Sequence, residues 1–174
     1  MAQLRATRAG VKVPSNASGW TNTTQRAWGL YEHTVSPAAA DTVVFCKLPK
    51  GALIVGGALK GDKLDSTGSG SALASINIGL DAAVVTPAGT TVTSASTSNA
   101  LLSSHSLGPD AAAIAGYKPQ ADVRNIPLGS LLLSEGPLRT TAECNVYVTW
   151  TASTLAFTTG TMWVEVDYYM DQHS

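Results

Sequence analysis

Few side chains in this sequence are of the kinds that catalyse reactions. The densest cluster is SSHSLGPD at residues 103–110, which contains Ser103, Ser104, His105 and Asp110. A serine, a histidine and an aspartate are the groups of a hydrolytic triad, but such a triad is built from groups that converge from separate segments. We therefore expect no catalysis at this cluster and predict that the chain is not an enzyme.

Metal and cofactor motifs are missing as well. His33, His105 and His173 are far apart in the sequence, and Cys46 and Cys144 lack the spacing of a metal site. The segment STGSGS lacks the lysine and the helix of a phosphate-binding loop. We predict no metal, no cofactor, no small-molecule substrate and no nucleic-acid partner. Both cysteines are expected to be buried and reduced.

Two carboxylates, Glu165 and Asp167, alternate with apolar residues near the end of the sequence. On a strand they would share one face about 6.6 Å apart, together with Trp163 and Tyr169. We expect a solvated strand face rather than a pair of groups for acid–base catalysis. Because two aromatic residues share it, a subunit contact and a sugar-binding platform are alternatives.

The elements that would carry these residues are strands. Two apolar runs, 42–48 and 53–55, flank the turn Pro49-Lys50-Gly51, and we expect them to be adjacent strands of one sheet. Gly56 and Gly57 predict a bulge or a close backbone approach. Residues 72–80 alternate strictly, which predicts a strand with one face toward the core.

Further strands are predicted in 84–97 around a Pro-Ala-Gly turn, in 123–133, in 142–153 and in 160–170. One short helix is predicted over 108–118. Together these patterns predict an all-β fold, an antiparallel β-sandwich that is jelly-roll-like with about eight strands.

Charge divides the 174 residues into two parts. Residues 1–31 contain four basic and no acidic residues, whereas residues 32–174 contain seven basic and twelve acidic ones, a net charge of −5. We predict an extended N-terminal arm over 1–31 and a single β-sandwich domain over 32–174. The basic arm would contact an acidic neighbour. Its candidate contact residues are Arg5, Arg8, Lys12, Trp20, Arg26 and Trp28.

The start of the sequence has no apolar segment of the kind found in secretory signals, and no apolar run is long enough to cross a bilayer. We therefore expect synthesis in a cytoplasm and no membrane partner. Charged residues are only 13% of the chain, which favours close packing against other subunits because few charges must lose their water.

Residues 41–81 resemble a pattern in small virion proteins of tailed bacteriophages. The pattern has a strand ending in Leu48-Pro49-x-Gly51-Ala52, a second apolar strand, a polar loop and a strand ending in Gly79-x-Asp81. The ending GTMWVEVDYYM resembles the final strand of the same group.

This resemblance implies a capsid cement or decoration protein with a jelly-roll body. It would bind the outer surface of the phage head and stabilise the mature shell. Its partners would be the major capsid protein and further copies of itself, as a homotrimer. Its location would be the virion surface, after synthesis in the host cytoplasm.

Two alternatives remain at this point. One is a structural component of the phage neck or tail, because jelly rolls serve there too. The other is a carbohydrate-binding module, possible because aromatic faces bind sugar rings. Its candidate residues are Trp150, Trp163, Tyr168 and Tyr169.

Overall fold

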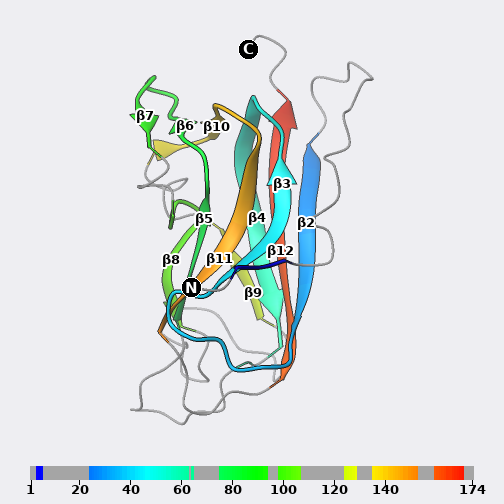
Figure 1. The fold of residues 1–174 in the computed structure, drawn as a ribbon. Coiled ribbons are helices and arrows are strands. Elements are labelled where there is room, and N and C mark those ends of the chain that lie inside the picture. Colours follow the sequence, from blue (N-terminus) through cyan, green and yellow to red (C-terminus); the bar gives the residue numbers. More distant parts are fainter. Residues whose placement is uncertain are drawn as a thin grey trace.

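A computed structural model describes residues 3–5, 24–62, 64, 75–93, 98–106, 124–128, 135–152 and 159–170. The described elements are twelve strands arranged in two sheets, which confirms the predicted all-β sandwich (Figure 1). The predicted helix over 108–118 lies outside the described residues.

The first sheet has five strands in the order β1-β3-β11-β5-β8. Their bounds are β1 Gln3–Arg5, β3 Thr42–Leu48, β11 Cys144–Ala152, β5 Ser75–Leu80 and β8 Leu102–Ser106. Strand β1 runs parallel to β3, and the other described pairings of this sheet are antiparallel.

The second sheet has seven strands, six of them in the order β2-β12-β4-β10-β6-β7, with β9 also paired to β4. Their bounds are β2 Gln25–His33, β12 Gly160–Met170, β4 Ala52–Gly61, β10 Leu138–Thr140, β6 Val84–Val85, β7 Thr91–Val92 and β9 Arg124–Pro127. The described pairings of this sheet are antiparallel.

The connectivity is jelly-roll-like, as predicted. Eight strands, β3 to β8 with β10 and β11, divide into a sheet ordered β3-β11-β5-β8 and a facing sheet ordered β4-β10-β6-β7. The chain crosses between the two sheets at most connections, which is how a jelly roll closes a core between two antiparallel layers. Strands β1, β2, β9 and β12 extend these two layers.

The crossing from β3 to β4 corrects one sequence-based expectation. The two apolar runs around the Pro49 turn were expected to be neighbours in one sheet, but they belong to opposite sheets. Thr140 fixes this turn, because its Oγ1 donates to the Pro49 carbonyl at 2.7 Å and accepts from the Ala52 backbone N–H at 3.0 Å. Both runs are rich in apolar residues because they face one another across the core.

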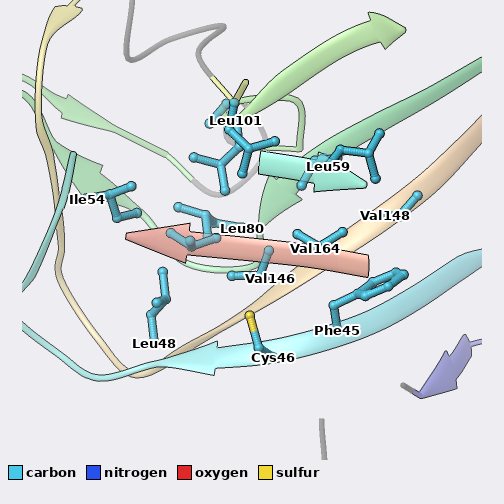
Figure 2. Packing of buried hydrophobic residues seen from close by; sticks show 14 of the residues in the cluster. Phe45, Cys46, Leu48, Ile54, Leu59, Leu80, Leu101, Val146, Val148 and Val164 are labelled. Atoms are coloured by element: carbon cyan, nitrogen blue, oxygen red, sulfur yellow. The ribbon is translucent and has the colours of Figure 1, made fainter. Parts of the chain in front are cut away.

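The core lies between the sheets and is built from alternating strand positions (Figure 2). On β5 the buried side chains are Ile76, Ile78 and Leu80, as the alternation of 72–80 predicted. Strand β12 likewise buries Met162, Val164, Val166 and Tyr168. Cys46 and Cys144 are both buried and free, as predicted. Strands β5 and β12 therefore direct their other faces away from the core.

Two glycines allow strands to approach closely, Gly29 between the two sheets and Gly57 within the seven-stranded sheet. A Cβ on Gly29 of β2 would lie 2.0 Å from the Phe45 carbonyl oxygen of β3. A Cβ on Gly57 of β4 would lie 2.2 Å from the Glu165 carbonyl oxygen of β12. The predicted close approach at Gly56-Gly57 is therefore confirmed at Gly57. A register shift between β4 and β12 leaves Val55 as the extra residue of a bulge beside it.

Candidate interaction surface

The outer face of β2, β12 and β4 carries a group of aromatic and charged side chains in the described part of the chain. The register pairs Trp28 with Glu165 and Arg26 with Asp167 between β2 and β12, and Trp163 with Lys60 between β12 and β4. We call these six residues the outer patch. They point away from the core because the neighbouring positions on each strand point into it.

Two indole rings form the aromatic half of the outer patch. Trp28 and Trp163 are stacked, with ring centroids 4.8 Å apart and planes inclined by 21°. Trp163 is opposite Leu30, two positions from Trp28, so the two rings meet along the diagonal of the strand pair. Both indoles are half-buried. The outer patch therefore presents a rigid aromatic surface that is partly open to solvent.

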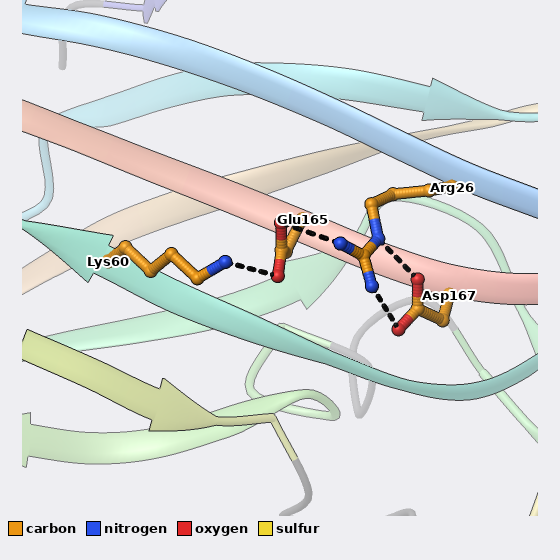
Figure 3. A network of polar contacts seen from close by, with 4 residues as sticks. All are labelled: Arg26, Lys60, Glu165 and Asp167. Carbon is orange, nitrogen blue, oxygen red and sulfur yellow. Dashed lines mark hydrogen bonds and ion pairs between the residues drawn. The ribbon is translucent and has the colours of Figure 1, made fainter.

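Four charged side chains form the other half of the outer patch (Figure 3). Arg26 donates from Nε to Asp167 Oδ1 at 2.7 Å and from Nη2 to Asp167 Oδ2 at 3.1 Å. Its Nη1 reaches Glu165 Oε2 at 3.3 Å. Lys60 donates from Nζ to Glu165 Oε1 at 2.7 Å. The network thus joins one residue of β2, two of β12 and one of β4.

The carboxylates of this network lie beneath the cations. The Glu165 side chain is 7% exposed and that of Asp167 23%, whereas Arg26 is 52% exposed and Lys60 35%. A buried carboxylate is tolerated where cations and hydrogen bonds compensate it. The hydrogen bond and negative charge of Asp167, followed by the charge of Glu165, raise the pKa of Arg26. The four charges sum to zero, yet the charges most exposed to solvent are positive.

Burial of Glu165 corrects the expectation of a solvated strand face. The alternation correctly placed Trp163, Glu165, Asp167 and Tyr169 on the side of β12 away from the core. It could not show that Arg26 and Lys60 arrive from the flanking strands and cover Glu165. Lys60 had no sequence signal of its own, because its partner is 105 positions away.

The six predicted contact residues occupy different places. Arg26 and Trp28 belong to the outer patch on β2, so the predicted boundary between arm and body at residue 31 lies inside a strand of the seven-stranded sheet. Arg5 ends β1, which pairs with β3. Arg8, Lys12 and Trp20 lie outside the described residues. The structure therefore brings two of the six together.

The four aromatic residues considered for sugar binding do not share a face. Trp150 and Tyr168 are in the hydrophobic core, with exposures of 0% and 4%. Trp163 and Tyr169 are on the outer face of β12 and are half-buried. Trp150 and Tyr168 are therefore excluded as sugar-binding residues, because alternation along β11 and β12 sends them inward.

Of the residues considered for hydrolysis in the described part of the chain, Ser103 alone has a described side chain. Ser103 is exposed and accepts a hydrogen bond from Asn99 Nδ2 at 3.3 Å, and Asp110 lies outside that part. His33 is in the core, where its ring meets those of Tyr31 and Trp150 edge to face at 4.6 and 5.3 Å. Burial lowers the pKa of His33 to about 4, which leaves the ring neutral at physiological pH.

The described residues lack two kinds of feature. They contain no group of three or more histidine, cysteine or acidic side chains able to hold a metal ion. They also contain no helix that is long and apolar enough to span a membrane.

Two solved structures of phage capsids are similar to this chain. A chain of the cyanophage Pam1 capsid asymmetric unit aligns with a TM-score of 0.60 and 19% identity, covering 93% of this chain and 95% of that one. A chain of the capsid of Ralstonia phage GP4 aligns with a TM-score of 0.61 and 16% identity, covering 99% and 100%. This chain shares their fold. No family model and no curated protein matches it.

Proposed function

We propose that this chain is a non-enzymatic structural protein of a phage virion, a cement or decoration protein bound to the outer surface of the head. The observation that carries the proposal is the nearly end-to-end similarity of fold to two chains of phage capsids. In each alignment more than nine-tenths of both chains is covered, so the similarity extends over the whole fold and is not limited to one motif. Its partners are the major capsid protein and further copies of itself, as a homotrimer.

The outer patch supplies a suitable means of attachment. Tryptophan and arginine are the residue types most enriched among energetically dominant interface positions. Here Trp28 and Trp163 are already stacked, and Arg26 is already held by Asp167, so little side-chain freedom is lost on binding. The exposed cations favour an acidic area on the shell.

This arrangement suits a protein that stabilises a shell without chemistry. A ligand that binds only the assembled shell stabilises it by mass action. Many copies arranged around symmetry axes gain avidity although each contact is weak. Arg26 and Lys60 already neutralise the buried Glu165 carboxylate within the chain, so docking over it does not require burial of an uncompensated charge.

The first test is the copy number of this chain relative to the major shell protein in purified virions, measured by quantitative mass spectrometry. A ratio near one supports a cement protein that covers the whole lattice. A few copies per particle would move the chain to the neck, tail or vertices. Absence from particles would refute a virion role altogether.

The second test asks whether the outer patch binds the shell. Shells lacking this chain are mixed with purified protein and separated on a density gradient. We expect Trp28→Ala and Arg26→Ala to lower shell occupancy at least tenfold at limiting protein concentration. Lys47→Ala is the matched control, because Lys47 is an ion-paired lysine on the outer face of the other sheet. Equal occupancy for all three variants would exclude the outer patch as the contact.

A further inference from the structure

The free edge of β3 is covered by a very short strand. Strand β3 has β11 on one side and β1 on the other, so β1 forms the edge of the five-stranded sheet. The paired positions are Gln3 with Thr42, Leu4 with Val43 and Arg5 with Val44. Just beyond them, at Phe45, β2 passes so close to β3 that only glycine fits at position 29. Strand β1 therefore covers the β3 edge at Thr42, Val43 and Val44, next to the place where β2 of the other sheet approaches β3.

This edge needs an occupant. An open edge strand presents unpaired N–H and C=O groups that invite pairing with other chains. The described part of β1 comprises three residues, and its pairing with β3 is the only parallel one among the described pairings. Parallel pairs are slightly less stable per residue than antiparallel pairs. The described contact that closes the edge is thus short and easily replaced by an equivalent strand.

The chain between β1 and β2 is long. Nineteen residues, 6–24, separate Arg5 from Gln25, and a fully extended chain of that length spans at most about 65 Å. Such a reach exceeds the width of a small sandwich. The sequence before residue 25 is also basic, whereas residues 32–174 carry a net charge of −5. This charge complementarity exists equally between two copies of the chain.

We propose that residues 3–5 form an exchangeable strand, which pairs with the β3 edge of a second copy in the same register when copies assemble. The backbone hydrogen bonds are the same whichever copy supplies the strand. Exchange of an identical element between protomers therefore requires little free energy. This inference concerns only copies of this chain, and it holds or fails independently of attachment to a shell.

The test is a disulfide that can form only between chains. One chain carries Arg5→Cys and the other Val44→Cys, at positions paired in the β1–β3 register. Neighbouring strands are about 4.8 Å apart, within the Cα separation that a disulfide bridges. The two variants are unfolded together, refolded at several concentrations and oxidised. We expect a covalent dimer whose 5–44 linkage is identified by peptide mass spectrometry.

The native cysteines do not interfere, because Cys46 and Cys144 are buried and burial raises the pKa of each thiol to about 12. The matched control pairs Arg5→Cys with Ala142→Cys, an exposed position beyond the far end of β3, where we expect no enrichment of the dimer. The double variant Arg5→Cys/Val44→Cys, with both cysteines in one chain, tests whether the 5–44 disulfide forms within a single chain.

Two results would overturn the proposal. If the double variant forms its disulfide within one chain while the mixed single variants form none, the strand stays with its own body. If neither preparation forms a 5–44 disulfide, residues 3–5 do not occupy the β3 edge at all. In contrast, a dimer that forms only in the mixture and increases with protein concentration supports exchange.

Discussion

The indole of Trp28 on β2 stacks on the indole of Trp163 on β12, with ring centroids 4.8 Å apart. The contact follows from the antiparallel register, which places the two residues on one face and on the diagonal of the strand pair. It gives the outer patch a fixed aromatic surface beside the charges of Arg26 and Lys60.

The stacking energy can be measured by a double-mutant cycle. We expect Trp28→Ala and Trp163→Ala to show a coupling of about 0.5–1.5 kcal/mol in the free energy of unfolding by urea. Trp28 and Tyr169 provide the control pair, because they share the outer face but are too far apart on it to touch. Additive losses for the two tryptophans would show that stacking contributes nothing.

The two cations that cover Glu165 should act together. Either Arg26 or Lys60 can compensate the buried carboxylate, so Arg26→Ala and Lys60→Ala should each be tolerated better than the double variant. We expect the double variant to lose more stability to urea than the sum of the single losses.

The control for this network is Lys47→Ala. Lys47 pairs with Glu143 at 3.3 Å in an exposed position, and its loss should lower the free energy of unfolding by less than about 1 kcal/mol. Strict additivity of the Arg26 and Lys60 losses would mean that Glu165 is compensated by other groups.

Gly29 tests the close approach of the two sheets. A methyl group at this position would meet the Phe45 carbonyl oxygen at 2.0 Å, so Gly29→Ala should lower the free energy of unfolding by about 1–3 kcal/mol. Gly56→Ala on β4 is the matched control, because nothing lies within 4 Å of a Cβ there. Thermal unfolding of both variants decides the matter. A Gly29→Ala protein as stable as the control would contradict the described crossing of β2 over β3.

His33 should make the fold sensitive to acid. Its ordinary pKa of 6.5 is lowered to about 4 in the folded protein by burial, so the unfolded chain binds a proton first as the pH falls. The contribution of neutral His33 to the free energy of unfolding is fully present above about pH 6.5. It is lost progressively as the pH falls toward 4. The shift corresponds to about 3 kcal/mol.

His33→Phe keeps an aromatic ring between Tyr31 and Trp150 but cannot take up a proton. We expect the difference in unfolding free energy between the variant and the unsubstituted chain to change with pH between 6.5 and 4 and to be constant above 7. Parallel stability curves over the whole range would show that His33 does not titrate differently in the two states.

The two thiols should be inert in the folded chain. Burial, first among the causes, raises the pKa of Cys46 and Cys144 to about 12, so little thiolate exists at neutral pH. A chromogenic disulfide reagent at pH 8 should therefore label neither cysteine until urea unfolds the protein, when both react. Rapid labelling in the folded state would show that one of the two strands opens locally.

The strands themselves were largely predictable from the sequence. The run 42–48 and the ending 160–170 coincide with β3 and β12, because β-branched and alternating residues report local backbone geometry and the burial of one face. The inward positions of β5 and β12 follow from the same alternation. The closeness in sequence of Ser103, His105 and Asp110 also predicted a protein without catalytic machinery, and this stays a prediction.

Pairing partners were not predictable, since they join residues distant in sequence. Alternation cannot say that the strands flanking Pro49 belong to opposite sheets, or that β2 and β4 flank β12. That arrangement decides which tryptophans stack and which cations cover Glu165. The sequence by itself thus determined which residues face inward, a property of each strand alone. The tertiary structure decided which outward residues meet, because register between strands depends on how the whole core packs.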